Sequence, residues 1–308
     1  REHIRVGSFN AQGGICNSIG ALEDHAKKNS YDILAVQETR LHPTTKLSAK
    51  GYKVYRQKSE LEDPQHGVLF LVSNHLAAGI TVEQSECANQ LWIRLTGAGS
   101  KKDMVFCAAH MPQESANVSE RKTAYGTLQA SAMAYSADSE VVILADMNAK
   151  VCSAADEEER VLLGAHCEPG KRTSNGKLLM DLLIAVGMVS LAGHSKPVAP
   201  SPASDPGFWW TRRDKATGGM HSIDYVLATA PLHVAKTECW VDYTDLDSDH
   251  HLIGATLGCP RTIMGKHNRP RRRRRYRTER LIQRSAAEED VEEADRHRGD
   301  LESALEEA

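Results

Sequence analysis

The sequence predicts a layered α/β fold, and three observations lead to this prediction. Short apolar segments typical of strands recur along residues 1–259. Amphipathic segments with helical spacing stand between them, but they are few and far apart. Many strands with few helices favour β-sheets that are covered by helices. Of the 308 residues, 41% are hydrophobic, which is enough for a large core.

The first half of the chain is predicted to contain mostly strands. Residues 4–9 and 33–37 are predicted to be buried strands, and the continuous apolar run at 67–72 is typical of a central strand. A helix is predicted at 119–135, with Ser119 as its N-cap and Glu120 in its first turn. The other elements predicted here are a helical segment at 20–28 and strands at 52–55, 91–95 and 104–109.

The second half continues the alternation. A strand at 141–145 ends in Asp146, and a helix at 176–186 places its leucines on one face. Residues 195–207 form a loop rich in Pro and Ser. The remaining predicted strands are 188–191, 208–212, 223–228, 237–242 and 251–257.

The composition changes after residue 259, which predicts one domain over 1–259, a basic linker over 260–284 and a charged, helical or disordered tail over 285–308. Between 261 and 284 there are 11 Lys+Arg against one acid. The net charge of -3 excludes a strongly basic nucleic-acid binder, so affinity for nucleic acid has to come from local patches. The basic run at 269–280 is therefore a candidate phosphate contact or nuclear localisation signal.

Cysteine usage and hydropathy suggest the cellular context. Seven cysteines with no Cys-x-x-Cys pair argue against a disulfide framework and a structural zinc, and favour reduced thiols in a reducing, intracellular compartment. No apolar run approaches the ~20 residues of a membrane helix, and no signal peptide opens the chain. Because the chain lacks an initiator Met, we expect it to be an excerpt of a longer protein.

Polar residues follow several predicted strands at the point where each strand ends. In α/β sheets, ligands gather where strand-end loops converge. Taken singly, each residue has a plainer explanation, such as a turn cap for Asn10 or an Asx-turn for Asp146 and Asn148. Together, carboxylates, amides and histidines at one edge suit a hard cation such as Mg²⁺ and a phosphodiester. The residues are Asn10, Glu38, His110, Asp146, Asn148, Asp224, Asp249 and His250.

Five spaced motifs in this order resemble the endonuclease/exonuclease/phosphatase superfamily. The motifs are Phe9-Asn10, Gln37-Glu38-Thr39, Leu144-Ala145-Asp146-Met147-Asn148, Ile223-Asp224-Tyr225 and Ser248-Asp249-His250. The resemblance covers residues 1–259 and implies a four-layered sandwich of two mixed β-sheets flanked by helices. It also implies a metal-dependent phosphodiesterase, with Mg²⁺ as cofactor and Mn²⁺ as its substitute.

The resemblance also implies roles for the strand-end residues. Glu38 would be the principal metal ligand, with Asn10 and Asp249 as further ligands. Asp146 would align or deprotonate the attacking water, helped by Asn148. His250, held by Asp224, would contact the scissile phosphate as an imidazolium or as a base. His110 would also donate to a phosphate.

Three departures favour one branch of the superfamily. Apurinic endonucleases usually carry Asp, Tyr and an aromatic residue where this chain has Gln12, His110 and His221. Segments 173–179, 221–226 and 248–252 instead resemble the endonuclease domain of non-LTR retrotransposons. That resemblance implies nicking of double-stranded DNA to a 3'-hydroxyl and a 5'-phosphate. The hydroxyl would prime reverse transcription by a fused domain, in the nucleus or in the cytoplasm before entry.

The DNA contacts predicted at this end are basic, amide and aromatic side chains of the loops. Three alternatives to a retroelement endonuclease stay open: an apurinic/apyrimidinic repair endonuclease, a lipid or inositol phosphate phosphodiesterase or phosphatase, and a catalytically inactive binding module. The predicted DNA contacts are Arg40, Lys171, Arg172, Asn175, Trp209 or Trp210, Arg212, Arg213 and Lys215.

Overall fold

The computed structural model describes most of the first 258 residues. The predicted linker at 260–284 and tail at 285–308 lie outside the described residues, as do Thr237 and part of the loop at 195–207. The described residues all belong to one compact unit, Arg1–Lys266, and the second unit, His267–Ala308, lies outside them. The described residues are 3–42, 44–56, 67–83, 85, 87–96, 102–196, 208–229, 238–243, 246 and 248–258, with the backbone alone at Cys16 and Asn17.

The first sheet has six strands and is mixed. In spatial order they are β13 (Glu238–Asp242), β14 (Leu252–Gly258), β1 (His3–Asn10), β2 (Ile33–Gln37), β4 (Leu69–Ser73) and β3 (Tyr52–Arg56). β1 and β2 run parallel, and the other neighbours are antiparallel. Asn10 stands opposite Gln37, so β1 and β2 end at the same edge of the sheet.

The second sheet is built in the same way. In spatial order its strands are β5 (Ile80–Glu83), β6 (Gln90–Leu95), β7 (Asp103–His110), β8 (Ser139–Asp146), β12 (Asp224–Thr229) and β9 (Met188–Ser190). β7 and β8 run parallel and end together, with His110 opposite Asp146. β12 runs antiparallel to β8 and begins where β8 ends, so Asp224 also stands opposite Asp146.

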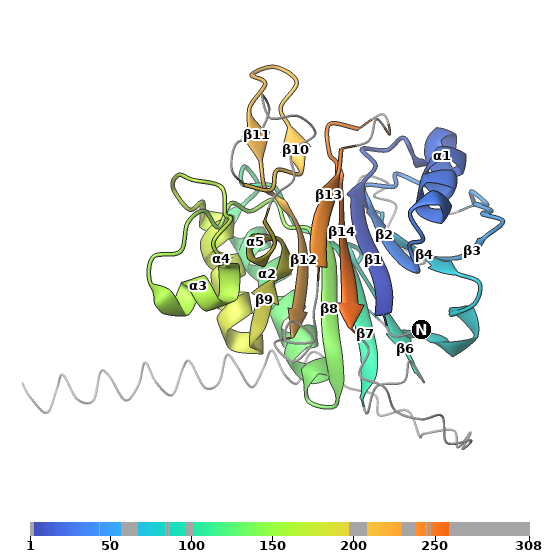
Figure 1. The fold of residues 1–308 in the computed structure, drawn as a ribbon, viewed down its shortest axis with the longest axis horizontal. Helices are drawn as coiled ribbons and strands as arrows, with labels where there is room; N and C mark the ends of the chain where they lie inside the picture. The colour runs from blue at the N-terminus through green and yellow to red at the C-terminus, as the bar shows by residue number, and fades with distance from the viewer. Residues whose placement is uncertain are drawn as a thin grey trace, which may run out of the picture. The chain divides into compact units, whose positions relative to one another are not determined.

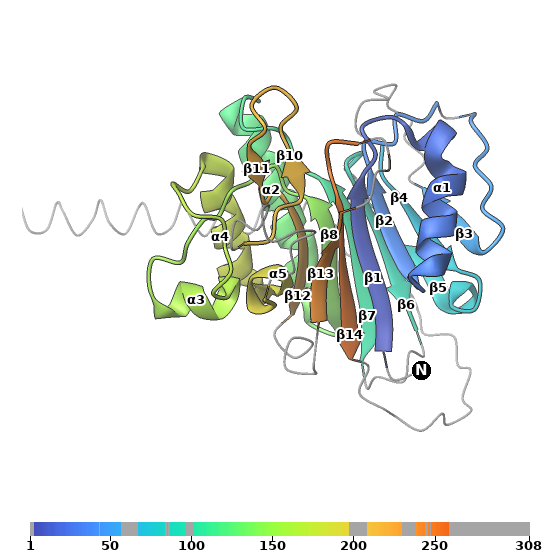
Figure 2. The ribbon, with the colours of Figure 1, turned by 45° about the horizontal axis from the view of Figure 1, so that its top comes forward.

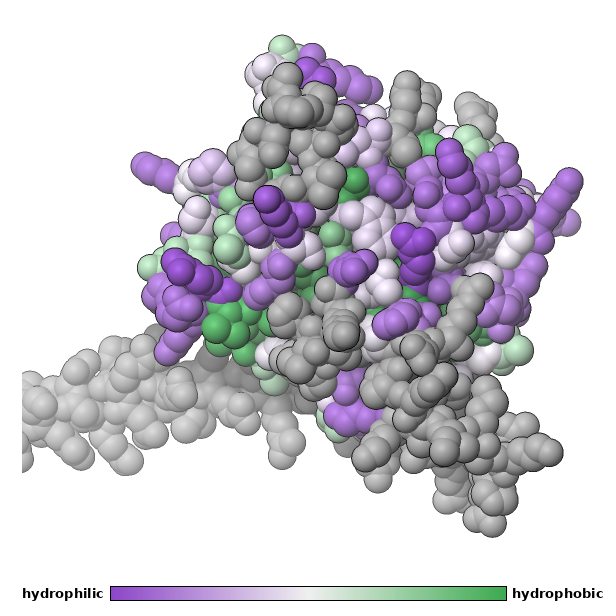
Figure 3. All heavy atoms as spheres, in the orientation of Figure 1, coloured by the Kyte–Doolittle hydropathy of each residue, from purple (hydrophilic) through white to green (hydrophobic). Residues whose placement is uncertain are grey.

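Helices cover the outer faces of both sheets (Figures 1 and 2). α1 (Ile15–Lys28) packs on the first sheet, and α2 (Val118–Ser136) and α4 (Ser174–Val186) pack on the second. The short elements are η2 (Ala77–Gly79), α3 (Glu157–Leu163), α5 (Leu191–His194) and the two-stranded sheet of β10 (Arg212–Arg213) and β11 (Met220–His221). Hydrophilic side chains gather around the exposed side of α1 (Figure 3).

β8 shows why the sequences of the central strands are continuous apolar runs. Val142 and Leu144 point into the core between the two sheets, whereas Val141 and Ile143 point into the core beneath α2 and α4. Successive side chains of a strand alternate between faces, and both faces of β8 are covered. Full burial of one such side chain contributes about 1.5–3 kcal/mol. The predicted four-layered sandwich of two mixed sheets flanked by helices is confirmed.

Two predicted helix starts need correction. α1 begins at Ile15, five residues before the predicted start, because Gly20 is exposed with open space around it and does not interrupt the helix. The N-cap of α2 is Asn117, whose side chain accepts a hydrogen bond from the backbone N–H of Ser119. Ser119, the predicted cap, therefore lies in the first turn.

The predicted strand at 208–212 is wrong. Phe208, Trp209 and Trp210 are buried, but their backbone is irregular, and only Arg212–Arg213 pairs with Met220–His221. Large aromatic side chains fill space without strand pairing, so an apolar run alone misleads. Sequence reasoning also missed α3, α5 and β5. For α3 a signal existed, because Asp156 caps the helix by accepting a hydrogen bond from the backbone N–H of Glu159.

The structure also bears on the expectations about thiols and membranes. Cys107, Cys152 and Cys239 are buried free thiols, as predicted from the cysteine pattern. Among the described residues, no helix combines the length and the apolar character that crossing a membrane requires.

Candidate active site

The polar strand ends meet at one edge of the two sheets. Asn10 ends β1, Glu38 follows β2, and His110 and Asp146 end the parallel strands β7 and β8. Asp224 begins the antiparallel strand β12, and Ser248 to His250 precede β14. The topology therefore brings together residues that are up to 240 positions apart in the chain, as the sequence pattern predicted.

The amide of Asn10 joins the two halves of the site. Its Nδ2 donates to Glu38 Oε1 at 2.9 Å and to Asp146 Oδ2 at 2.8 Å, across the gap between the sheets. Its Oδ1 accepts a hydrogen bond from the backbone N–H of Gln12 at 2.9 Å. Asn10 is fully buried, so these bonds are shielded from water. Asn10 therefore positions the two carboxylates here, and its role as a direct metal ligand stays a prediction.

Glu38 remains ionised although it is partly buried. Burial pushes the pKa of Glu38 upward, but the hydrogen bond from Asn10 and the positive charges of His110 and Arg40 outweigh it, so the pKa lies below its ordinary value. His110 Nε2 is 3.5 Å from Glu38 Oε1, and Arg40 Nη2 donates to Oε2 at 2.9 Å. A carboxylate that is ionised and still reached by solvent suits a cation ligand.

Asp146 is in the opposite condition. Burial raises the pKa of Asp146 and the neighbouring Asp224 carboxylate raises it further, against the charges of His250 and His110 and the N–H of Asn148. Asp146 and Asp224 stand opposite each other across β8 and β12, which is why the charge of Asp224 raises the pKa of Asp146. Asp146 is thus suited to accept a proton.

Asp224 and His250 form a buried pair. His250 Nδ1 is 2.9 Å from Asp224 Oδ2, and both side chains are almost completely buried. Burial alone would lower the pKa of His250, but the charge of Asp224 and the hydrogen bond to it raise the pKa to about 9. His250 is therefore an imidazolium at neutral pH, with Nδ1 on Asp224 and Nε2 3.6 Å from Asp249 Oδ1.

The Ser248-Asp249-His250 segment is tied to strand ends and to the small sheet. Ser248 Oγ donates to Asn10 O at 2.8 Å, and the backbone N–H of Asp249 donates to Gln12 Oε1 at 3.1 Å. Arg212 Nε donates to Asp249 Oδ2 at 3.2 Å, while Asp249 Oδ1 is buried and accepts no hydrogen bond from the described residues. Asp249 Oδ1 lies 3.6 Å from His250 Nε2 but accepts no hydrogen bond there, so it can still offer a lone pair to a cation.

His110 and Asn148 complete the centre. Asn148 Nδ2 donates to Met111 O at 2.9 Å and lies 3.3 Å from His110 Nε2. His110 Nε2 is 3.9 Å from Asp146 Oδ2. Both side chains therefore lie beside the two carboxylates, as predicted.

The donor set fits a divalent metal ion. Two clusters bring their potential ligand atoms within 4.8 Å of one another, Glu38-His110-Asp146 and Asp146-Asp224-His250. Carboxylate oxygens dominate, and Glu38 is the partly exposed member, through which an ion can be reached. The second cluster is fully buried and is occupied by its own ion pair, so the cation fits best at Glu38.

Several site loops hold non-glycine residues in the left-handed region. The φ angle is 46° at Glu38, 45° at Gln12, 45° at Arg40 and 45° at Asn148. Such a conformation costs about 1–3 kcal/mol per residue and persists only where neighbouring bonds enforce it. At Asn148 the enforcing bond is its own N–H donating to Asp146 Oδ1 at 2.8 Å.

The predicted DNA contacts fall into three groups. Lys171, Arg213 and Lys215 are exposed and available. Arg40 and Arg212 reach the site, but each is paired with a carboxylate there, Glu38 and Asp249 respectively. These five residues remain candidate contacts.

The third group is corrected by burial or pairing. Arg172 donates from both terminal nitrogens to Glu159, which lowers the pKa of that carboxyl to about 2. Trp209 and Trp210 are both buried, and Trp210 packs against Tyr243. Asn175 is completely buried. Arg172 Nε also donates to Val151 O at 2.9 Å, so that all of its nitrogens are engaged. Arg172, Asn175 and both tryptophans therefore belong to the scaffold rather than to the DNA contacts.

Sequence reasoning missed a polar cluster beside the site. His221 Nδ1 is 2.7 Å from Lys150 Nζ and 3.1 Å from Glu168 Oε1. Glu168 also accepts a hydrogen bond from the backbone N–H of Ser222, which leads into β12. Lys150 follows Asn148 closely in the chain, but nothing in the local sequence indicates its partner, which is 71 residues away.

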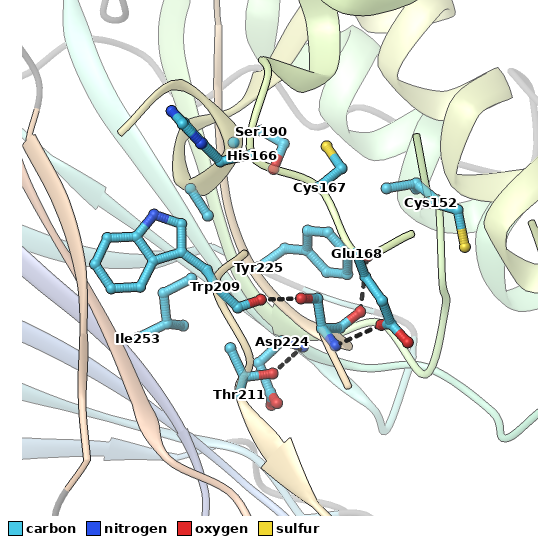
Figure 4. Close-up of a pocket in the computed structure, with 14 residues that line it drawn as sticks. Cys152, His166, Cys167, Glu168, Ser190, Trp209, Thr211, Asp224, Tyr225 and Ile253 are labelled. Carbon is cyan, nitrogen blue, oxygen red and sulfur yellow. Dashed lines mark hydrogen bonds between the residues drawn. The ribbon is translucent and has the colours of Figure 1, made fainter. Parts of the chain in front are cut away.

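A small pocket lies behind Asp224 (Figure 4). Thr211 supports the strand start there, since its Oγ1 accepts hydrogen bonds from the backbone N–H groups of Ile223 and Asp224. Ser222 Oγ donates to Trp209 O at the same place. These bonds fix the position from which Asp224 holds His250.

Comparisons with known proteins agree with this geometry. A model of the Endonuclease/Exonuclease/phosphatase family matches residues 7–250, which include every residue of the centre. No curated protein matches the sequence.

Solved structures share the fold at low sequence identity. An AP endonuclease from Leishmania major has a TM-score of 0.64 at 11% identity, over 84% of this chain and 89% of that one. The APE2 catalytic domain from Xenopus laevis gives 0.62 at 16%, over 85% and 94%. The endonuclease domain of TRAS1, a telomere-specific non-LTR retrotransposon, gives 0.54 at 15%, over 83% and 99%. At these identities the likeness concerns the fold alone.

Proposed function

The chain belongs to the endonuclease/exonuclease/phosphatase family and is a metal-dependent phosphodiesterase; on that premise we propose that it is a Mg²⁺-dependent endonuclease that nicks double-stranded DNA. The product would carry a 3'-hydroxyl and a 5'-phosphate. The observation that carries the proposal is the intact centre in which one amide nitrogen, Asn10 Nδ2, bridges Glu38 and Asp146 beside the Asp224-His250 pair.

Glu38 would hold the cation, with Asp249 contributing Oδ1, which accepts no hydrogen bond from the described residues. When bound, the ion would supply positive charge to the phosphate and lower the pKa of a water molecule. Carboxylate ligands with retained waters are the coordination that Mg²⁺ prefers, and Mn²⁺ accepts the same ligands.

His250 would stabilise negative charge on the scissile phosphate. It is an imidazolium with Nδ1 engaged by Asp224, so its Nε2–H is the proton available to a phosphate oxygen. A residue that already carries its proton at neutral pH is a poor general base. This favours the stabilising role over the basic role for His250.

Asp146 would orient the attacking water and take its proton. Its raised pKa brings its proton affinity closer to neutral pH, which improves general base catalysis. Asn148 and His110 would direct donors at the phosphate from the neighbouring loop. The nucleophilic oxygen then bonds to phosphorus while the 3'-oxygen leaves.

A target-nicking role in a retroelement is the most specific form of the proposal. It is supported by the motifs around Thr173, His221 and Ser248 and by the shared fold with the TRAS1 endonuclease domain. The proposal includes a reverse transcriptase domain in the full-length protein and action in the nucleus.

An apurinic repair endonuclease is the second candidate, because an AP endonuclease from Leishmania major and the APE2 catalytic domain from Xenopus laevis share the fold. Against it, His221 stands in a polar cluster with Lys150 and Glu168 rather than in an apolar wall suited to a baseless sugar. The two functions can be distinguished by comparing the cleavage rates of an intact duplex and of a duplex with one abasic site, supplied in equal amounts. Strong preference for the abasic duplex would favour the repair function.

The decisive experiment is nicking of supercoiled plasmid with Mg²⁺, followed by mapping of the nick and its end groups. Glu38→Ala should lower the nicking rate by about two to four powers of ten. Asp181→Ala, which removes an exposed carboxylate from α4, should leave the rate unchanged. Undiminished nicking by Glu38→Ala would reject the metal assignment.

A further inference from the structure

The loop after β8 is held by donors from several elements. Four consecutive carbonyls, at 147–150, each accept one hydrogen bond, and the donors come from α2, α4, β12 and the N-cap of α4. The pairs are Tyr125 Oη to Met147 O at 2.6 Å, Asn175 Nδ2 to Asn148 O at 2.9 Å, Tyr225 Oη to Ala149 O at 2.9 Å and Thr173 N to Lys150 O at 3.1 Å. The backbone that carries Asn148 is therefore fixed by the two outer helices and by β12.

Asn175 differs from the other donors because it also reaches the second catalytic loop. Its Nδ2 donates to Pro112 O at 2.9 Å, in addition to Asn148 O. Pro112 stands two residues after His110. One buried amide thus joins the loop that carries His110 to the loop that carries Asp146 and Asn148.

Arg121 determines which way this amide faces. Its Nη1 donates to Asn175 Oδ1 at 3.0 Å, and a guanidinium has no acceptor to offer. The oxygen of Asn175 must therefore face Arg121, which leaves both N–H groups for the two carbonyls. Glu114 holds the same helix end by accepting hydrogen bonds from the backbone N–H groups of Ser174 and Asn175.

The distances inside the centre depend on this link. Asn148 Nδ2 donates to Met111 O, and Met111 N donates to Asp146 O at 2.9 Å. These bonds and the Asn175 bridge together set the 3.3 Å between Asn148 Nδ2 and His110 Nε2. A shift of about 1 Å in such a group costs on the order of 100-fold in rate.

We propose that Asn175 is a positioning residue for catalysis, whose amide sets the spacing between the His110 loop and the Asp146-Asn148 loop. The proposal rests on the proposed phosphodiesterase function. It gives Asn175 no contact with DNA, in contrast to the role that the sequence suggested.

Asn175→Asp tests the proposal with a side chain of the same size. The variant keeps the acceptor for Arg121 but loses both donors. We expect kcat for plasmid nicking to fall by about one to two powers of ten, with little change in KM for DNA. Amide hydrogen exchange in free protein should accelerate at Met111, at Gln113 and at 147–150. Asn175→Ser, which keeps one donor, should lie between wild type and Asn175→Asp and serves if the latter does not fold.

Leu183→Ala is the matched control. Leu183 is buried in the same helix, two turns away, and donates no hydrogen bond to either loop, so this variant destabilises α4 while leaving the Asn175 bridge in place. Its kcat should stay within about twofold of wild type at a temperature where it is folded. The proposal is overturned if the Asn175 variants lose no more kcat than Leu183→Ala, if KM rises instead, or if exchange in both loops is unchanged. Hydrogen exchange is measured without DNA. If the wild type fails to nick DNA, the proposed function is rejected, but the exchange measurement still tests whether Asn175 positions the two loops.

Discussion

At the scale of single residues, burial and charge assign the acid and base roles. His250 and Asp146 both have raised pKa values, but for different reasons. Asp224 attracts the proton on His250, whereas burial and repulsion from Asp224 disfavour the charged form of Asp146. The first effect keeps His250 protonated, and the second makes the Asp146 carboxylate more basic. One aspartate thus favours a proton on both of its neighbours.

The pH dependence of nicking should reveal His250. Because its pKa is about 9, activity that needs the imidazolium should decline as the pH rises through about 9. Asp224→Asn removes the charge that raises this pKa, so the alkaline decline should move to lower pH. The profile of kcat/KM between pH 6 and 10 would check this, and an unmoved alkaline limb in the variant would contradict the assignment.

The same pair should influence stability with a defined sign. The pKa of His250 is raised from 6.5 to about 9 in the folded protein. Its stabilising contribution is therefore fully present below about 6.5 and is lost as the pH rises through about 9. Denaturant unfolding of wild type and His250→Gln should differ most at the acid end of this window. A difference that grows toward pH 9 would contradict it.

At the scale of elements, the first turn of α4 packs directly on the catalytic loop. A Cβ at Gly176 would lie 2.1 Å from Lys150 O, a backbone atom that cannot move alone. Gly126 in α2 is also helical, but it is exposed and has nothing within 4 Å. Substituting alanine at each of the two glycines therefore distinguishes the effect of helix propensity from the effect of close packing.

Gly176→Ala should destabilise the protein although alanine is the better helix former. Propensity favours alanine by up to about 1 kcal/mol, but the clash with the loop costs about 1–3 kcal/mol. We also expect reduced nicking, because the displaced backbone lies two residues from Asn148. Gly126→Ala should instead stabilise by up to about 1 kcal/mol. Thermal unfolding would measure both, and equal shifts in the two variants would refute the close packing.

The attachment of α3 should respond to acid. Arg172 donates twice to Glu159 and lowers the pKa of that carboxyl from 4.5 to about 2. A depressed pKa gives stability that is present above about 4.5 and lost as the pH falls through about 2. Glu159→Gln should cost about 1 kcal/mol at pH 7, after allowance for solvent screening, and much less as the pH falls through about 2. Urea unfolding at several pH values would show whether the gap closes.

At the scale of the whole molecule, residues at the interface between the two sheets hold the strand ends that carry the site. Gln37 ends β2, and its Nε2 donates to Ser8 Oγ and, across the interface, to Leu144 O, both at 3.0 Å. The apolar core of both sheets lies beneath it, and within the described part of the chain the buried clusters run from Ile4 to Leu257. Folding of the described residues is thus accounted for by that span.

Deleting residues 260–308 should therefore spare the fold and the chemistry. The thermal midpoint and the nicking rate at saturating DNA should change little. DNA affinity should fall and depend less steeply on salt, because this segment carries a run with 11 Lys+Arg between 261 and 284. An unchanged salt slope would show that the segment does not contact DNA.

How far the sequence reaches is visible in particular residues. Strand alternation and apolar runs predicted most strands, and Glu38, Asp146, Asp224 and His250 were predicted to meet because chain order and strand ends are local properties. The prediction of a strand at 208–212 was wrong because a run of aromatic residues is compatible with a strand and with an irregular buried segment. Asn175 was predicted to contact DNA because its amide lies near Arg172 in the sequence, and its complete burial became known only from the structure.

The layered fold, the family and the polar residues at the strand ends could be predicted from the amino-acid sequence, since these follow from side-chain chemistry and spacing along the chain. Only the tertiary structure decided that Asn10 bridges two carboxylates, that Asp224 raises the pKa of His250, and that Arg121 turns the amide of Asn175 toward two loops. Hydrogen-bond partners and burial depend on which distant segments pack together, and no local pattern encodes that.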